Sequence, residues 1–151
     1  MTIQAARKEA DSYLDMAYEA FPTDPASDPA YVYADHSRGG LALYNGLIQL
    51  EKGDATQAWN GFESFKGYDF TLPERIRVLI VNQQSRAALL DNDLEKYAYC
   101  LKEGLSGAVA LKSKKHFAEA YSIFQQEMPT GWLQHHKIKP IVERYQLLQD
   151  N

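Results

Sequence analysis

The sequence contains one cysteine, no long hydrophobic run and no excess of basic residues. Cys100 has no second cysteine for an internal disulfide, which favours a reducing compartment. No apolar run approaches the roughly 20 residues of a membrane-spanning helix, and residues 1–16 are too polar for a signal peptide. With 16 Lys and Arg against 20 Asp and Glu, the formal charge is −4, which disfavours a basic binding face. We therefore expect a cytoplasmic protein that contacts neither nucleic acid nor membrane.

Catalytic and metal-binding motifs are missing as well, including a Gly-rich loop ending in Gly-Lys, HExxH, GxSxG and CxxC. Asp35, His36 and Ser37 are the residue types of a hydrolase triad. Consecutive residues cannot easily form its chain of hydrogen bonds, so we expect Asp35 or Ser37 to cap a helix. His135 and His136 are adjacent, whereas helical metal pairs stand three or four residues apart. We expect no catalysis, no cofactor and no metal, and a packing role for the lone cysteine.

A chain of 151 residues fits one domain, and a regularly spaced turn divides it into similar units. The turn signals are Gly53-Asp54, Asn92-Asp93 and Thr130-Gly131. Gly53 and Asn92 are 39 residues apart, as are Asn92 and Gly131, and each turn lies between two helical patterns. We predict a single all-α domain over residues 1–151 with about seven helices. Because the first helix has no upstream partner, we expect the chain to be a fragment of a longer protein.

Hydrophobic residues recur at helical spacing along most of the chain. The stripe after the second turn consists of Leu94, Tyr97, Ala98, Leu101, Leu105, Ala108 and Val109. The N-terminal stripe consists of Ala6, Ala10, Tyr13, Leu14, Ala17 and Phe21. The segment from Arg75 to Leu90 is apolar around most of its circumference, so we expect it to lie between other helices. Helices are expected to begin at Pro73 and at or just before Pro140, and Ser113 is expected to cap a third.

Residues 39–73 resemble the tetratricopeptide repeat. Its small, turn, small and aromatic positions are matched by Gly46, Gly53-Asp54, Ala58 and Phe62. Gly46 and Ala58 would let two helix backbones approach closely, and Phe62 would fill the space under the next helix. Tyr97 stands where the second unit should have a small residue. The resemblance implies antiparallel helical-hairpin repeats stacked as a tetratricopeptide-like α-solenoid.

Three segments are also similar to the C-terminal portion of bacterial helix-turn-helix (Xre-type) transcriptional regulators: RKEADSYLDMAYEAF, YVYADHSRGGLALYNGLIQLEKGD and ERIRVLIVNQQSRAALLDNDLEKYAYCLKEGL. In that family a DNA-binding domain precedes tetratricopeptide-like repeats. No short basic two-helix unit is found in this chain. The resemblance implies the sensor or assembly region of such a regulator, without its DNA-binding part.

Tyrosine is abundant, with 10 Tyr against 6 Phe and 2 Trp. Tyrosine suits half-exposed grooves that bind peptides, although the rings could equally bridge stacked helices. Aligning the three turns places eight residues on the concave surface: Tyr44, Leu47, Asn82, Gln83, Arg86, Tyr121, Ser122 and Gln125. Asn, Gln and Arg there would hold peptide backbone or a carboxylate. Gly40 and Leu79 stand where the carboxylate clamp of some tetratricopeptide proteins has Lys, which disfavours chaperone-tail binding.

These patterns predict a non-catalytic domain that binds a peptide or protein partner. The alternative is a self-associating scaffold that forms a homo-oligomer, because a terminal helix without its partner exposes an apolar edge. A small helical enzyme using Glu or His ranks last, since no constellation of catalytic residues supports it.

Overall fold

The computed structural model describes residues 31–67 and 72–150, together with residues 5, 6, 8, 9, 12, 13 and 16. The two long ranges form six α-helices: α2 (Tyr31–Glu51), α3 (Ala55–Glu63), α4 (Glu74–Leu90), α5 (Leu94–Leu111), α6 (Lys114–Glu127) and α7 (Lys139–Asp150). Two short 3-10 helices, η2 (Ser64–Gly67) and η3 (Thr130–Trp132), follow α3 and α6. No strand occurs in the described residues, so the fold is all-helical as predicted.

The predicted count of seven helices differs from these six because the N-terminal helix falls largely outside the described residues. The seven positions described before α2 are helical. Among the helices in the described ranges, none is both long and apolar enough to cross a membrane.

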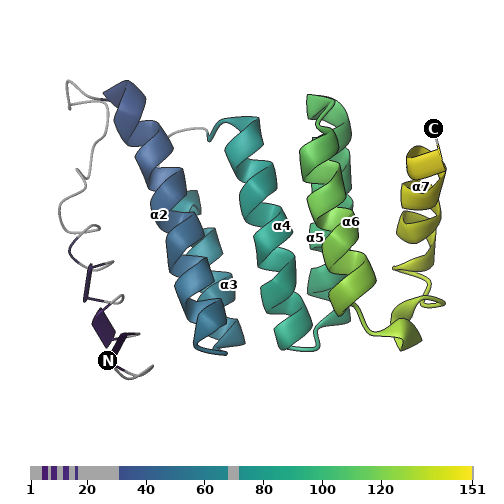
Figure 1. The fold of residues 1–151 in the computed structure, drawn as a ribbon, viewed down its shortest axis with the longest axis horizontal. Helices are drawn as coiled ribbons and strands as arrows, with labels where there is room; N and C mark the ends of the chain where they lie inside the picture. The colour runs from purple at the N-terminus through teal and green to yellow at the C-terminus, as the bar shows by residue number, and fades with distance from the viewer. Residues whose placement is uncertain are drawn as a thin grey trace.

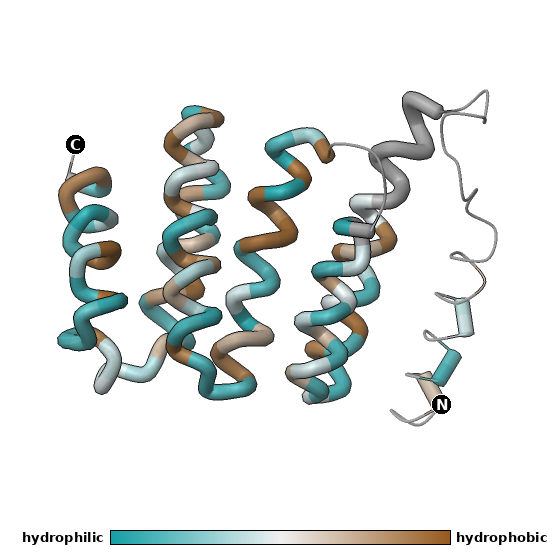
Figure 2. Tube along the Cα trace, turned by 180° about the vertical axis from the view of Figure 1, so that it is seen from behind, coloured by the Kyte–Doolittle hydropathy of each residue, from teal (hydrophilic) through white to brown (hydrophobic). Residues whose placement is uncertain are grey.

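Consecutive helices run in opposite directions, with α2, α4 and α6 side by side and α3 and α5 behind them (Figure 1). α4 contacts α2, α3, α5 and α6, which confirms that the segment from Arg75 to Leu90 lies between other helices. Hydrophobic residues recur along most of its length (Figure 2). Most of its buried residues are apolar or small, among them Val78, Ile80, Val81, Ala87 and Ala88.

The first two predicted turns join helices tightly, because their residues satisfy both the backbone geometry and the helix starts. Gly53 has φ 78° and Asn92 has φ 54°, the left-handed region that Gly and Asn adopt most easily. The Asp54 carboxylate accepts a hydrogen bond from the Gln57 amide at 3.0 Å. Asp93 accepts one from the backbone of α5 in the same way. Each turn therefore ends one helix and caps the next.

Small residues bring paired helices close together. A Cβ atom on Gly46 would overlap the Phe62 ring, and one on Gly61 would lie 2.9 Å from the Gly46 nitrogen. Ala58 and Phe62 are fully buried between α2, α3 and α4. The packing role predicted for Phe62 is confirmed, whereas Gly46 makes room for the Phe62 ring and the close approach to backbone lies at Gly61. In the second pair the close approach comes from Gly104 on α5, which the sequence pattern did not identify.

The third predicted turn is different from the first two. α6 ends at Glu127 and α7 begins only at Lys139, so Thr130-Gly131 opens η3 instead of a tight turn. His135 and His136 lie in this connection, not on a helix. Long connections do not impose the close antiparallel pairing that a three-residue turn does.

Other local expectations are confirmed or corrected. Ser113 caps α6, accepting from the His116 amide at 3.2 Å, and Cys100 is a buried packing residue whose thiol pKa burial raises to about 12. The expectation that Asp35 or Ser37 caps a helix is wrong, because α2 begins at Tyr31 and includes both positions. The residue types at Asp35 and Ser37 placed that helix start too late.

Candidate binding groove

A hollow in the described part of the chain lies between the C-terminal end of α5, one face of α6 and the C-terminal end of α7. Its volume is about 620 Å³. We call it the α6 groove, and its lining consists of Ala108, Val109, Lys112, Ser113, Lys114, Phe117, Ala118, Tyr121, Ser122, Gln125, Leu148 and Gln149. Three predicted site residues, Tyr121, Ser122 and Gln125, therefore share one groove.

One stripe of α6 forms the longest wall of the groove. Lys114, Ala118, Tyr121 and Gln125 follow the spacing of a single helix face. The opposite face of α6, which includes Ala120 and Phe124, is buried in the core. The helix thus packs on α4 and α5 with one side and leaves the other for the groove.

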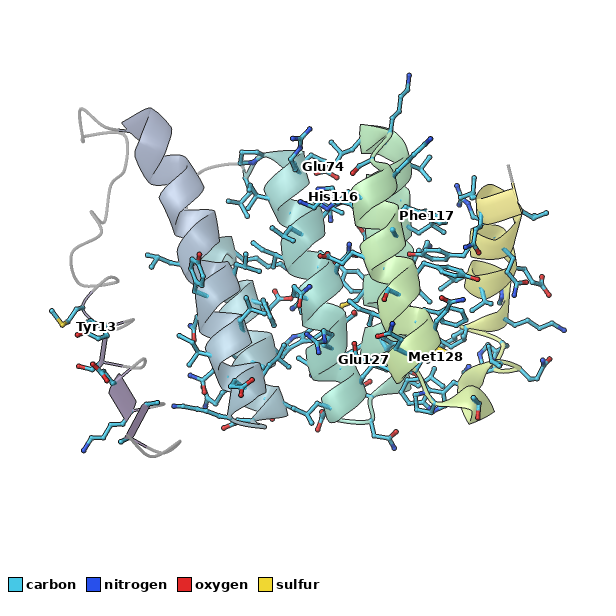
Figure 3. All side chains as sticks on the ribbon, viewed as in Figure 1. Tyr13, Glu74, His116, Phe117, Glu127 and Met128 are labelled. Carbon is cyan, nitrogen blue, oxygen red and sulfur yellow. The ribbon has the colours of Figure 1, made fainter. Side chains whose placement is uncertain are left out.

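Aromatic rings hold α6 and α7 apart beside the groove. The rings of Phe117 and Tyr145 have centroids 5.1 Å apart, and those of Tyr121 and Tyr145 are 6.2 Å apart. Phe117 lies on the side of α6 that faces α7 (Figure 3). The Tyr145 hydroxyl donates to the Leu101 carbonyl of α5 at 2.9 Å, and burial raises the pKa of this phenol. These contacts fix the middle of α7, while Leu148, one turn further along, is 37% exposed beside the groove.

The charges that line the α6 groove are all positive. Lys112 and Lys114 are exposed lining residues at the junction of α5 and α6, and no Asp or Glu belongs to the lining. The start of α6, with its partial positive charge, lies between them. This local excess stands out on a chain whose formal charge is −4.

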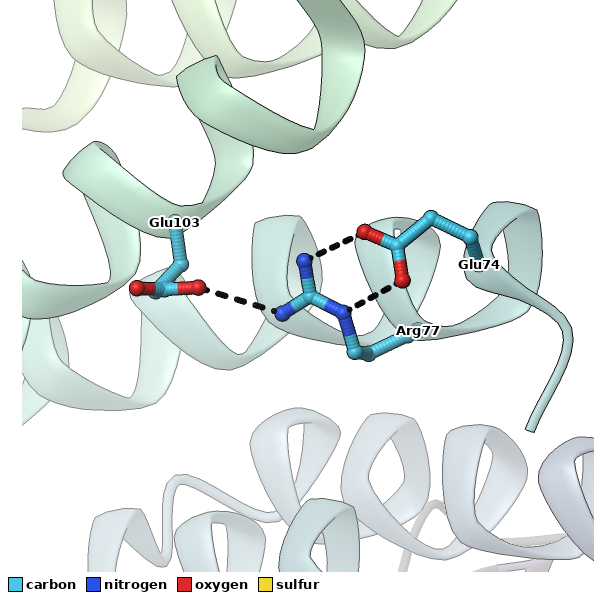
Figure 4. A network of polar contacts seen from close by, with 3 residues as sticks. All are labelled: Glu74, Arg77 and Glu103. Carbon is cyan, nitrogen blue, oxygen red and sulfur yellow. Dashed lines mark hydrogen bonds and ion pairs between the residues drawn. The ribbon is translucent and has the colours of Figure 1, made fainter. Parts of the chain in front are cut away.

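The neighbouring pair of helices neutralises its charges internally. Arg77 on α4 donates to both carboxylate oxygens of Glu74 at 2.9 and 2.7 Å, and to Glu103 on α5 at 3.3 Å (Figure 4). The Arg77 guanidinium holds the pKa of Glu74 below its usual value. By contrast, no Asp or Glu lines the α6 groove, so Lys112 and Lys114 have no carboxylate partner among the lining residues.

Two other predicted site residues line a second, smaller hollow. Its volume is about 410 Å³ and its lining consists of Leu47, Leu50, Glu51, Arg86, Leu89, Leu90 and Glu127. Arg86 donates to Glu127 at 3.1 Å and contacts the Gln83 side-chain oxygen at 3.5 Å. The guanidinium is therefore already engaged within the fold, which weakens its predicted role as a grip for a ligand.

The prediction for Asn82 is wrong. Asn82 is only 2% exposed, and its amide donates to the His116 carbonyl at 3.1 Å, which joins α4 to α6. A buried polar side chain needs such a partner, so this amide serves packing instead of ligand contact. Tyr44 is 63% exposed on α2 but lines neither hollow. The single concave surface expected from the turn alignment is thus divided into separate sites.

Several groove residues were not predicted, among them Val109, Phe117, Ala118 and Leu148. Val109 belongs to the predicted apolar stripe of α5 yet is 43% exposed. The sequence contained one signal of this groove. α6 carries apolar residues on two faces, whereas a helix that buries a single face needs them only there. Which face stays open depends on where α7 packs.

His135 and His136 are stacked, with ring centroids 4.4 Å apart, and His135 Nδ1 accepts a hydrogen bond from the Lys137 amide at 3.1 Å. Within the described ranges, no group of three or more His, Cys, Asp or Glu could hold a metal ion. Comparisons with known protein families, curated proteins and solved structures find no match to this chain. The likeness to tetratricopeptide repeats and Xre-type regulators therefore rests on the residues themselves.

Proposed function

We propose that this chain is a non-catalytic, tetratricopeptide-like helical-repeat domain that binds a helical peptide or protein segment in the α6 groove. The observation that carries the proposal is the groove itself: its volume is about 620 Å³, and its lining combines apolar and aromatic side chains with an equal number of polar or charged ones. Hollows of this size and lining are typical of binding sites. An amphipathic helix places its apolar face in such a groove and its charges at the rim.

The contacts between helices support a solenoid arrangement. α2 packs on α3 and α4, α4 on α5 and α6, and α5 on α6 and α7. In a stacked array of hairpins, each unit contacts only its neighbours in just this order. Glycines at the α2–α3 and α4–α5 contacts support the same architecture, since small residues are what close helix pairing requires.

The place of the domain in a transcriptional regulator follows from the resemblance of the three quoted segments, and a cytoplasmic location follows with it. A ligand that fills the α6 groove would favour one position of α7 relative to α6. Such a population shift can be passed to attached DNA-binding domains only if the ligand prefers one of the two positions.

The test is a selection of helical peptides displayed against the full chain, followed by measurement of their affinities. Ala118→Glu places a charge on an exposed position of the groove wall, and Tyr121→Ala removes an aromatic contact. Each should weaken binding by about tenfold or more, because a long charged side chain on the wall obstructs an apolar partner and a lost ring removes apolar contact, and tenfold corresponds to about 1.4 kcal/mol. The control Arg86→Ala, in the smaller hollow, should leave affinity unchanged. Peptides that bind both groove variants as well as they bind the wild type would refute the site.

Self-association is the second candidate function, favoured by exposed apolar side chains near the same end of the fold. Leu147 is 67% exposed on α7, and Val109 is 43% exposed on α5. A solenoid end without a polar cap tends to pair with other surfaces.

A further inference from the structure

We propose that the occupant of the α6 groove is the N-terminal helical segment of a second copy of this chain. The inference rests on the proposed function, since it requires the groove to be a binding site. It names the partner from two features of the same chain: a predicted apolar helix stripe whose described tyrosine, Tyr13, is exposed, and a groove lined by apolar side chains and by charges of the opposite sign.

The first feature is the N-terminal stripe defined above by Ala6, Ala10, Tyr13, Leu14, Ala17 and Phe21. The described residues of this segment are helical. Tyr13 is 64% exposed and Met16 is 59% exposed. A large aromatic side chain on the apolar face of an amphipathic helix is usually covered, so its exposure indicates a missing partner.

The lengths of the two features are compatible. A helix from Ala6 to Phe21, as the sequence predicts, would rise about 22 Å at 1.5 Å per residue. The lining residues of α6 span Lys114 to Gln125, which is about 17 Å along the helix. One helix of this length can therefore lie along α6 with its stripe facing Ala118 and Tyr121.

The charges are complementary as well. Residues 1–21 contain four acidic residues, Glu9, Asp11, Asp15 and Glu19, against two basic ones, Arg7 and Lys8. The charged residues that line the groove are Lys112 and Lys114. An acidic helix is attracted to such a rim, and the attraction weakens with added salt.

The segment and the groove are different surfaces of the chain, so a contact between two copies joins unlike surfaces. Contacts of this kind close as rings or as a reciprocal pair, or continue as open chains.

The deciding experiment mixes two variants of the full chain. Tyr13→Glu disables the N-terminal segment but keeps the groove, and Ala118→Glu disables the groove but keeps the segment. Analytical ultracentrifugation should show wild-type assemblies that grow between about 1 and 100 µM, and each variant alone as a monomer. An equimolar mixture of the two should form a 1:1 heterodimer and nothing larger, because only one working contact remains.

Two further arms sharpen the test. The control Tyr99→Glu alters an exposed tyrosine on α5 that lines neither hollow, and it should assemble like the wild type. A labelled peptide of residues 1–21 should bind the Tyr13→Glu chain, and its affinity should fall at least fivefold when Lys112→Glu and Lys114→Glu are added. Circular dichroism of each variant should match the wild type, since all these positions are exposed.

A wild-type chain that stays monomeric over this range, or a variant mixture that stays monomeric, would overturn the inference. So would assembly that Tyr99→Glu abolishes as fully as Ala118→Glu does. In those cases, if Ala118→Glu and Tyr121→Ala still weaken the binding of selected peptides, the proposed function holds and the partner is a different one. Failure of both the mixture and the peptide selection would overturn the two together.

Discussion

The contact between α4 and α5 is closed, whereas the contact between α6 and α7 opens into a groove. Gly107 on α5 lies so close to Val78 on α4 that an added Cβ would overlap the valine methyl. Between α6 and α7 the facing residues include Phe117 and Tyr145, whose rings are 5.1 Å apart. Two helices separated by such bulky rings cannot close along their whole length.

The two regions also differ in whether their charged side chains are paired with charges of opposite sign. Arg77 links Glu74 on its own helix with Glu103 on α5, whereas the α6 groove presents two lysines and no carboxylate. At the α4–α5 contact the side chains fill the space between the helices and Arg77 pairs with both carboxylates, so no groove is left there. Where neither condition holds, between α6 and α7, a groove remains.

The largest expected effect comes from removing the ring that fixes α7. Tyr145→Ala should lower the free energy of unfolding by about 3–5 kcal/mol, because Tyr145 is 1% exposed and packs against α5 and α6. Urea denaturation followed by circular dichroism would measure it. Leu147→Ala, on the exposed side of α7, is the control and should change stability by less than about 0.5 kcal/mol. Similar losses in the two variants would show that Tyr145 does not hold the open region together.

A smaller effect is expected when the closed region is forced apart. Gly107→Ala should destabilise the chain by about 1–3 kcal/mol, because the new methyl group meets the Val78 side chain. Gly40→Ala is a matched control, since a Cβ atom there meets nothing within 4 Å, and it should stabilise by about 0.5–1 kcal/mol. Thermal unfolding of both variants would give the comparison. A stabilising Gly107→Ala would contradict the proposed tightness of the α4–α5 contact.

Removing the two buried tyrosine hydroxyls should have different effects on the free energy of unfolding. Tyr145→Phe removes the hydrogen bond to the Leu101 carbonyl and should cost about 1 kcal/mol. The Tyr97 hydroxyl is buried with no hydrogen-bond partner among the described residues, so Tyr97→Phe should be neutral or stabilising. Burial raises the pKa of both phenols. Equal losses in the two variants would mean that Tyr97 has a partner in solution.

The smallest effect concerns the ion pair at the start of α4. Because Arg77 lowers the pKa of Glu74 below its ordinary 4.5, the pair stabilises the fold above that pH. The contribution disappears as the pH falls through the lowered pKa. Glu74→Gln should cost less than about 1 kcal/mol at pH 7, since both partners are partly exposed, and nothing near pH 2. Unfolding midpoints across this range, with the exposed Glu143→Gln as control, would test it. A loss that persists at low pH would point to packing instead of charge.

Much of the fold could be predicted because its signals are local. The turns at Gly53-Asp54 and Asn92-Asp93 can be recognised in the sequence. Gly and Asn adopt left-handed backbone easily, and the aspartate that follows caps the next helix. The central position of α4 followed from its hydrophobic circumference. The start of α2 was missed, because the cap was assigned to Asp35 or Ser37, which both lie inside the helix.

The candidate site was predicted only in part. Tyr121, Ser122 and Gln125 share the α6 groove because one helix face carries all three, and a helix face can be worked out from spacing. Asn82 and Arg86 were misplaced, because their partners, His116 and Glu127, lie 34 and 41 residues away on α6. Pairings at such distances depend on how the helices pack.

The amino-acid sequence by itself determined that this chain is helical, where most helices begin and end, and which face of each is apolar. These properties depend on backbone geometry and spacing within a few residues. Only the tertiary structure decided which apolar face would be covered and which would line a groove. That choice depends on the volumes of side chains that meet across helices: glycine closes the α4–α5 contact, and the Phe117, Tyr121 and Tyr145 rings keep α7 away from α6.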